Sequence, residues 1–324
     1  MRTIVQLCVV VATLIIFSAC GDAADSESGV DKQRAVLVTG ASTGIGRKIA
    51  EVLAEQGHFV YAGARKQADL DALNAIENIQ AIKLDVTVQE QIDAAVVTVK
   101  EGGRGLYGLV NNAGVFVGGP LADVDLSELQ WLMDVNVYGV YRTTQAFAPM
   151  IIEEKGRITT IGSIAGTLSG KFSGHYSMSK HAIEAYTDSL AAEMAPLDVH
   201  VSVIEPGNYD SRIADTAKAR LTSKKDEYAK EGSLFVEDFD KWINQPWDRS
   251  QYKEPGEVAD AAMHALFDDN PFRRYMVVPN EQEAGLTIGK QIEELVQLNE
   301  YQGYSYTRDE LIEKLDAAMA DDSE

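Results

Sequence analysis

Two residues four positions apart carry the clearest chemistry in this sequence. The segment "HYSMSK" contains Tyr176 and Lys180, which point along one face if the segment is helical. A phenol has a pKa of about 10 and is a poor acid–base catalyst at neutral pH, but a nearby ammonium group stabilises the phenolate. Tyr176 could then give a proton to a carbonyl oxygen or take one from an alcohol. The alternative is an ordinary helix-surface pair, because a single Tyr-x-x-x-Lys motif is weak evidence in a chain with 13 tyrosines.

Two further polar residues could complete such a site. Ser163 follows the apolar run "RITTI", and its hydroxyl could hold a substrate oxygen beside the tyrosine. Asn136 is polar at a point of "MDVNVYGVYRTTQAF" where the helical period indicates burial, so its amide could hold a water in a proton relay. Each has a plainer interpretation, Ser163 as a turn residue and Asn136 as a structural hydrogen-bonding group.

A glycine-rich loop indicates where a cofactor would bind. The segment "AVLVTGASTGIGRKIAEVLAEQG" predicts a strand, a tight turn and a helix, with glycines at positions 40, 44 and 46. Such glycines let the backbone turn sharply, approach a phosphate and pack the helix closely on the strand. A pyrophosphate would then lie at the positive end of the helix. Glycines also make ordinary turns, but their place after the first strand of a strand–helix–strand unit favours a dinucleotide.

The residues after the second predicted strand bear on the choice of cofactor. Folds that prefer NAD place an acidic residue there, against the adenosine ribose. Here "YAGARK" offers Arg65 and Lys66, and a guanidinium suits the ribose phosphate of NADP. We predict NADP, with NAD as the alternative if Arg65 and Lys66 are only a solvated pair. Asp85, after the third strand, could accept a hydrogen bond from the adenine amine.

Short β-branched runs alternate with helical stretches from Arg34 onward. The strands are predicted at 35–39, 59–63, 79–86, 107–114, 157–163, 199–207 and 274–279. The helices are predicted at 47–56, around Leu70, and at 89–100, 133–150, 176–194, 255–267 and 307–320. The alternation predicts an α/β fold with a doubly wound, Rossmann-like parallel sheet, as one domain over 34–324 with C-terminal helices at about 284–320. Thr307 and Glu310 form a capping box at the start of the last helix.

The N-terminus has the composition of an export signal. Arg2 precedes an apolar run from Ile4 to Ala19, which is short for a membrane span and typical of a signal-peptide core. We predict residues 1–20 as a signal or membrane-anchor segment and the acidic stretch 21–33 as a flexible tether. The positive-inside tendency then sends the domain outward.

The end of this segment resembles a bacterial lipoprotein signal. Small residues, Ser18 and Ala19, precede Cys20, although Phe17 stands where leucine is usual. We expect a lipid anchor at Cys20 and a membrane-attached domain that faces the periplasm. The alternatives are an uncleaved anchor with a cytoplasmic domain and a translation start further downstream.

Composition excludes several classes of partner. The chain has 50 acidic and 29 basic residues and a formal charge of -21, which repels phosphate backbones, so we expect no nucleic-acid partner. The cysteines, Cys8 and Cys20, both fall in the leader. The five histidines have no metal-binding spacing, so we predict no metal site.

Together these motifs resemble the short-chain dehydrogenase/reductase family over nearly the whole chain from Arg34. The shared elements are "TGASTGIG", Arg65, Asp85 with Val86, "NNAG" at Asn111 to Gly114, Asn136, Ser163, "YSMSK" and "PG" at Pro206. The resemblance implies an oxidoreductase that moves a hydride between nicotinamide and a secondary alcohol or ketone. It implies a catalytic tetrad of Asn136, Ser163, Tyr176 and Lys180. It also implies cofactor contacts at Gly40, Ser42, Thr43, Gly44, Ile45, Gly46, Arg65, Asp85, Val86, Asn111, Asn112, Ala113, Gly114, Tyr176, Lys180, Pro206, Gly207 and Ser211.

Three segments resemble the branch of the family that contains retinol and hydroxysteroid dehydrogenases, which suggests a lipophilic substrate. They are "GLYGLVNNAG", "KFSGHYSMSKHAIEAYTDSLAAEM" and "VSVIEPGNY". The stretch at about 212–252 fits a substrate lid, or its aromatic residues pack the lid's own core; these are Phe235, Phe239, Trp242, Trp247 and Tyr252. The family also implies a homodimer or homotetramer. The rival function is a non-catalytic dinucleotide-binding sensor, against which the intact tetrad argues.

Overall fold

The structure of the protein is a computed structural model that describes residues 33–228, 232–245, 252–301 and 303–321. The predicted leader with Cys20, and the predicted tether as far as Lys32, lie outside the described residues. Trp247 of the predicted lid also lies outside them. One compact unit spans Gln33–Glu324.

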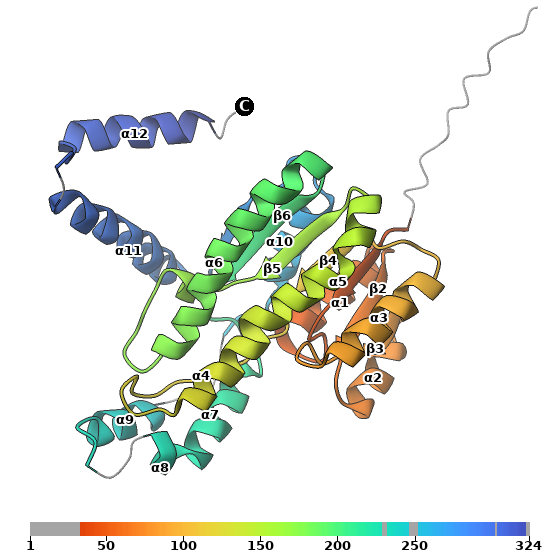
Figure 1. The fold of residues 1–324 in the computed structure, drawn as a ribbon, viewed down its shortest axis with the longest axis horizontal. Helices are drawn as coiled ribbons and strands as arrows, with labels where there is room; N and C mark the ends of the chain where they lie inside the picture. Colours follow the sequence, from red (N-terminus) through yellow and green to blue (C-terminus); the bar gives the residue numbers. More distant parts are fainter. Residues whose placement is uncertain (1–32, 229–231, 246–251, 302, 322–324) are drawn as a thin grey trace, which may run out of the picture. The chain divides into compact units, whose positions relative to one another are not determined.

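In the described part of the chain, seven parallel strands form one sheet (Figure 1). The strands are β1 (Ala35–Val38), β2 (Phe59–Ala64), β3 (Ile79–Lys83), β4 (Gly108–Asn111), β5 (Arg157–Ile161), β6 (His200–Pro206) and β7 (Arg274–Val277). Their order is β3-β2-β1-β4-β5-β6-β7, with every neighbouring pair parallel. The order reverses between β1 and β4, which is the doubly wound arrangement. The predicted fold class is therefore confirmed.

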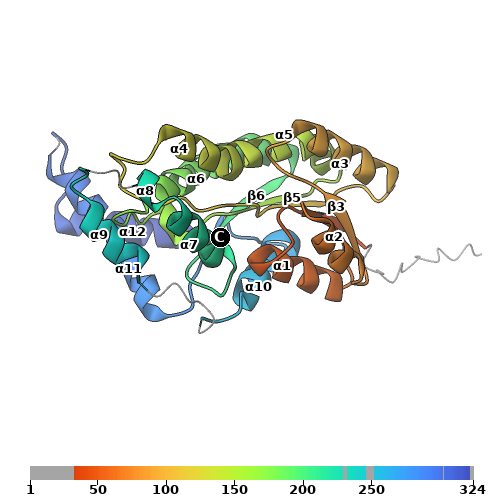
Figure 2. The same cartoon turned by 90° about the horizontal axis from the view of Figure 1, so that it is seen from below.

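Helices cover both faces of the sheet, as Figure 2 shows. One layer contains α1 (Gly44–Glu55), α2 (Gln67–Asn74) and α10 (Gly256–Phe267), and the other contains α3 (Gln89–Glu101), α5 (Gly139–Glu153) and α6 (Gly174–Met194). The period-two alternation of β1 divides its side chains between the layers. Val36 and Val38 pack in the first hydrophobic core, whereas Ala35 and Leu37 pack in the second.

The segment predicted as one helix over 133–150 is divided into three pieces. Helix α4 (Leu126–Met133) runs into a π-helical turn at Asp134–Tyr138, and α5 follows. A π-turn places one extra residue in the helix and occurs often at functional sites. Asn136 lies in this turn and bonds to the backbone of Val115 through both its oxygen and its nitrogen. The π-turn places Asn136 against Val115 in the loop after β4. A regular helical period does not predict this turn.

Three short helices lie in the described residues of the predicted lid, α7 (Ile213–Ser223), α8 (Lys225–Tyr228) and α9 (Val236–Ile243). Phe239 is fully buried in a small core with Phe172 and Tyr228, and Trp242 packs against that core. For Phe239 and Trp242, the structure therefore supports the alternative that lid aromatics pack the lid itself.

Two helices follow β7 at the C-terminal end, α11 (Glu281–Glu300) and α12 (Arg308–Asp321). The predicted capping box is confirmed, since Thr307 Oγ1 accepts from Glu310 N–H at 3.3 Å and Glu310 Oε2 accepts from Thr307 N–H at 2.7 Å. Among the residues that the structure describes, no helix combines the length and the apolar character that crossing a bilayer requires.

Candidate active site

A cavity of about 480 Å³ lies at the carboxyl ends of the strands. Residues that directly follow strands line it, from Gly40 after β1 to Gly207 after β6, and α7 contributes a further wall. The carboxyl ends at the reversal point of a doubly wound sheet are where ligands bind in this architecture.

Most of the predicted site residues meet in this one cavity. The lining contains Gly40, Ser42, Thr43, Gly44, Ile45, Arg65, Asp85, Val86, Asn112, Ala113, Gly114, Ser163, Tyr176, Lys180, Pro206, Gly207 and Ser211. Three predicted site residues lie outside the lining, namely Gly46, Asn111 and Asn136. The reasons for their positions differ.

The glycine-rich loop is held tightly against the loop after β4. Gly40 has φ +65°, and a Cβ there would lie 2.8 Å from the Cα of Ala113. Asn112 Nδ2 donates to the carbonyl of Gly40 at 3.1 Å, and a Cβ on Gly46 would overlap the same amide. Gly46 therefore allows close packing behind the loop, and the residues at the N-terminus of α1 remain open to the cavity. This cradle suits the pyrophosphate of a dinucleotide.

Asn111 does not line the cavity, and its predicted cofactor contact stays a prediction. It is buried in β4, where its amide donates to Thr144 Oγ1 at 3.0 Å and its carbonyl accepts from Thr143 Oγ1 at 2.6 Å. Successive residues of a strand point to opposite faces, so Asn112 turns toward the glycine loop and Asn111 toward α5. Asn111 ties the sheet to α5.

Arg65 and Asp85 lie together at one end of the cavity. Arg65 Nη1 is 3.7 Å from Asp85 Oδ2, and the Arg65 side chain is 64% exposed. Asp85 also accepts hydrogen bonds from the backbone and the hydroxyl of Thr87, at 3.0 and 2.7 Å. An exposed pair of this kind contributes little to stability, so Arg65 is free to contact a ligand.

Tyr176, Lys180 and Ser163 converge on the opposite part of the lining. Lys180 is buried, its Nζ donates to the carbonyl of Ile161 at 2.8 Å, and it lies 5.6 Å from the centre of the Tyr176 ring. Burial lowers the pKa of Lys180 to about 8, and the nearby carboxylate of Glu184 opposes this shift. The ammonium is therefore still mainly protonated at neutral pH. Ser163 begins the short 3-10 turn Ile164–Gly166, where its Oγ accepts from the N–H of Ala165 at 3.1 Å.

Asn136 supports the site from behind. Its Nδ2 donates to the carbonyl of Val115 and to Ser179 Oγ, both at 3.0 Å, and its Oδ1 accepts from Val115 N–H at 2.8 Å. Both amide hydrogens are therefore used within the protein. Its Oδ1 has a second acceptor position, so the predicted relay water at Asn136 stays a prediction.

Sequence reasoning did not identify several residues of the lining. Phe116 packs against the Tyr176 ring, with 5.1 Å between the ring centres. Trp131 of α4 and Arg220 of α7 also line the cavity, and the guanidinium carbon of Arg220 lies 4.0 Å from the Trp131 ring centre. These residues belong to no short motif, and only the packing of the lid on α4 brings the last two together.

Comparison with known proteins agrees with this geometry. Residues 34–222 match the model of the short chain dehydrogenase family. The mitochondrial D-beta-hydroxybutyrate dehydrogenase of Rattus norvegicus is 32% identical over 274 residues, which is 78% of each chain. The 3beta-hydroxysteroid dehydrogenase dhs-16 of Caenorhabditis elegans is 32% identical over 263 residues, which is 74% of this chain and 67% of the relative.

Solved structures give the same picture. A short-chain dehydrogenase from Streptomyces avermitilis is 29% identical, with a TM-score of 0.70 over 83% of this chain and 96% of that one. A metagenomic short-chain oxidoreductase in complex with NADP is 28% identical, with a TM-score of 0.59 over 77% of this chain and 98% of that one. This chain belongs to the short-chain dehydrogenase family and is a dinucleotide-dependent oxidoreductase.

Proposed function

We propose that this protein is an NADP-preferring enzyme that interconverts a secondary alcohol and its ketone. The observation that carries the proposal is the convergence of Tyr176, Lys180 and Ser163 in the cavity that the glycine-rich loop also lines. A dinucleotide-binding sensor would have no need for a phenol and a buried ammonium beside the ligand. The chemistry supplied by a bound nicotinamide is hydride transfer to or from the carbinol carbon.

The residues that would hold the cofactor follow from the lining. The backbone between Gly40 and Ile45 would receive the pyrophosphate. Arg65 supports the preference for NADP, because its guanidinium is exposed and can pair with a ribose phosphate. Its contact with Asp85 is loose, with 3.7 Å between Nη1 and Oδ2. The NADP complex of the metagenomic relative is consistent with this choice.

Three side chains would move and hold the proton. In reduction, the Tyr176 hydroxyl donates its proton to the carbonyl oxygen, and in oxidation the phenolate takes the proton of the alcohol. The Ser163 hydroxyl can donate a hydrogen bond to the same oxygen. The Lys180 ammonium stabilises the phenolate electrostatically, and the carbonyl of Ile161 fixes its position.

The substrate that fits best has an apolar body. Phe116 packs beside Tyr176, and Trp131, Leu168 and Ile213 also line the cavity. The two named relatives act, by their names, on a hydroxybutyrate and on a hydroxysteroid, and both substrates carry an alcohol on a carbon skeleton. We propose a lipophilic ketone or secondary alcohol for this protein.

A kinetic experiment on the purified full chain tests the function. A panel of ketones and alcohols is followed by nicotinamide absorbance with NADPH, NADP, NADH and NAD. We expect turnover that falls by about a hundredfold or more in Tyr176→Phe, because the ring stays while the transferable proton is lost. Cofactor binding by fluorescence should persist in this variant. Wild-type turnover by Tyr176→Phe would refute the mechanism.

We further propose that the N-terminal segment attaches the domain to a membrane through lipid at Cys20. The support is the apolar run before the cysteine and the acidic stretch after it. Cell fractionation, intact mass and protease accessibility would be compared for the wild type and Cys20→Ala. Soluble, full-length, protease-shielded protein in both would leave a cytoplasmic enzyme instead.

We also propose self-association through α5 and α6. Large side chains at Tyr141 and Met178 are about half exposed on these helices, as is Tyr138 in the π-turn before α5. Exposed apolar side chains gathered on neighbouring helices suit an interface between copies. Sedimentation should give a dimer or tetramer at micromolar concentration, and a monomer would contradict this.

A further inference from the structure

Arg220 is a cation in the cavity wall that has no role in the proposed proton transfer. It lies on α7 and stacks on Trp131 of α4, and both side chains line the cavity. The other arginine of the α7 side, Arg212, directly follows Ser211, the residue that lies against Gly44 of the phosphate loop. Arg220 instead belongs to the wall where the lid meets α4.

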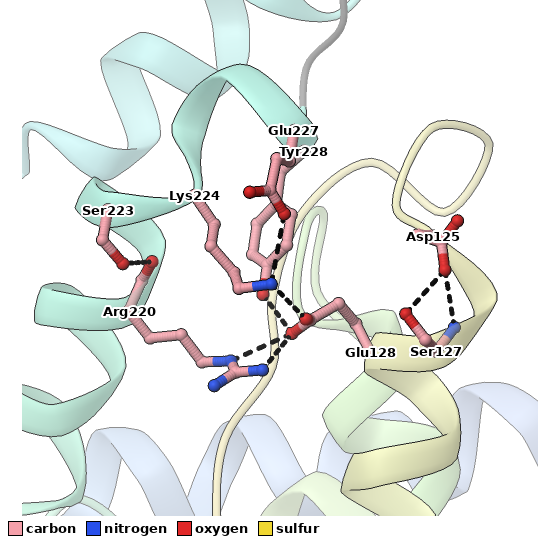
Figure 3. A network of polar contacts seen from close by, with 8 residues as sticks. All are labelled: Asp125, Ser127, Glu128, Arg220, Ser223, Lys224, Glu227 and Tyr228. Carbon is pink, nitrogen blue, oxygen red and sulfur yellow. Dashed lines mark hydrogen bonds and ion pairs between the residues drawn. The ribbon is translucent and has the colours of Figure 1, made fainter.

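A buried carboxylate holds Arg220 in place, as Figure 3 shows. Arg220 donates from Nε and Nη2 to Glu128 Oε2, at 2.9 and 2.6 Å. Lys224 Nζ donates to Oε1 at 2.7 Å, and the Tyr228 hydroxyl donates to Oε2. Three of these donors lie on Oε2 and one lies on Oε1. The two bonds from one guanidinium to Oε2 fix the orientation of Arg220.

Two cations, Arg220 and Lys224, contact the buried carboxylate of Glu128. Lys224 has a second carboxylate partner, Glu227, at 3.1 Å, whose side chain is 66% exposed. Arg220 therefore shares the carboxylate of Glu128 with a second cation. Within the part of the chain that the structure describes, Arg220 Nη1 makes no hydrogen bond, and in Figure 3 this nitrogen is the one turned away from Glu128.

The surrounding lining offers this nitrogen no protein anion. The acidic residue that lines the cavity is Asp85, which lies beside Arg65 at the adenosine end. Around Arg220 the wall is mainly apolar, with Trp131, Ile213 and Ala217. A preoriented guanidinium in an apolar wall is suited to a carboxylate on a ligand.

We propose that Arg220 binds a carboxylate of the substrate, so that the natural substrate is an oxo- or hydroxy-carboxylic acid with an apolar body. This proposal rests on the proposed ketone–alcohol chemistry. Arg220 Nη1 donates to the carboxylate, Trp131 packs against the apolar body, and Glu128 keeps the guanidinium in position.

The test compares oxo-carboxylates with their neutral methyl esters. The ketone would be placed at varied distances from the acid, and kcat/KM for each acid would be divided by that for its ester. In the wild type we expect a preference for at least one acid. In Arg220→Met this preference should fall by about tenfold or more, because a charge-assisted hydrogen bond is lost, while turnover of the ester is retained.

Lys224→Met is the matched control. Lys224 contacts the same carboxylate but does not line the cavity, so its loss weakens the Glu128 group and should leave the preference unchanged. Arg220→Met leaves the carboxylate of Glu128 without its guanidinium partner and can destabilise the fold. The double variant Glu128→Gln/Arg220→Met neutralises both side chains and should also lack the preference for the acid.

Three results would overturn the proposal. They are an acid preference that survives in Arg220→Met, an equal loss in Lys224→Met, and a wild type that turns over esters but no acid better. In the last case the proposed ketone–alcohol function stands and only the carboxylate site fails. Absence of turnover with every ketone would instead refute the proposed function and this inference with it.

Discussion

Two clusters of charge near the cavity have opposite compositions. In the first, one carboxylate, Glu128, joins α4 to the lid through Arg220 and Lys224. In the second, one guanidinium, Arg274 of β7, meets three carboxylates, Glu184, Asp188 and Glu205. Each cluster connects segments that are far apart in the chain, and each contains a buried acid.

The number of cations that contact an acid decides the direction of its pKa shift in these two clusters. Burial raises the pKa of Glu128, but hydrogen bonds from Lys224, Tyr228 and Arg220 outweigh it and hold that pKa below its usual range. At Glu184, burial and the adjacent Glu205 raise the pKa to about 7, and the single guanidinium only partly opposes them. Direct hydrogen bonds from two cations therefore keep Glu128 ionised, whereas Glu184 shares one guanidinium with two other acids and titrates near neutral pH.

The second cluster lies directly behind the proposed catalytic residues. Glu184 is one helical turn after Lys180 on α6. Its Oε1 lies under the loop that carries Ser163, where a Cβ on Gly162 or Gly166 would be 2.9 or 2.8 Å away. A larger residue at either glycine would displace the carboxylate. The first cluster thus holds the lid, and the second supports the floor of the active site.

The largest effect on stability should follow from removing the carboxylate of the first cluster. Glu128→Ala leaves two cations and the Tyr228 hydroxyl without their common acceptor. Because removal of one member of a buried ion group leaves uncompensated charge, we expect a loss of about 3 kcal/mol in the free energy of unfolding. Urea unfolding measures this loss, and limited proteolysis should show earlier cleavage in 213–243. Glu77→Ala, at an exposed position, is the control. A loss below about 1 kcal/mol would contradict a stabilising role for the cluster.

A smaller, pH-dependent effect should follow from removing the titrating acid of the second cluster. The pKa of Glu184 is about 7 in the folded protein against 4.5 for a glutamate in the unfolded chain, so the native state binds more protons in this window. Stability contributed by this group is therefore lost as the pH rises from about 4.5 to 7. Glu184→Gln cannot titrate, and its stability should be flatter over this range by on the order of 2 kcal/mol.

Unfolding of Glu184→Gln at several pH values would measure this change. The matched control is Asp188→Asn, which contacts the same guanidinium at 2.8 Å but is 52% exposed and should keep the wild-type dependence on pH. If Glu184→Gln has the same slope as the wild type, another group is responsible for the titration.

The smallest effect on stability is expected at the exposed pair of Arg65 and Asp85. This pair should contribute less to the free energy of unfolding than the Glu128 and Arg274 clusters. Arg65→Ala should change the free energy of unfolding by less than about 0.5 kcal/mol, because the pair is exposed and its atoms are 3.7 Å apart. The same variant should weaken NADPH binding by about tenfold or more and leave NADH nearly unchanged. Equal weakening of both cofactors in a fluorescence titration would argue against the proposed preference for NADP.

The sequence by itself determined the local features of this protein. The strand–turn–helix with glycines at 40, 44 and 46, and the alternation of strands and helices, depend on neighbours in the chain, so their periods predict the doubly wound sheet. The spacing of Tyr176 and Lys180 likewise follows from one helix. The structure accordingly brings the tyrosine, the lysine and Ser163 into one cavity with the glycine loop.

Only the tertiary structure decided which polar residues support the site and which face a ligand. Asn111 and Asn112 are equivalent in the motif, but their side chains point to opposite faces of the sheet. Asn111 bonds to Thr144 of α5, and Asn112 bonds to Gly40 of the glycine-rich loop. Asn136 commits its amide to Val115 across a π-turn that no regular period predicts. Glu128 and Arg220 are 92 residues apart, and Glu184 and Arg274 are 90 apart. Ion pairs between residues so far apart leave no pattern in the sequence. Which residues pair is set by how the lid and the last strand pack after the sheet has formed.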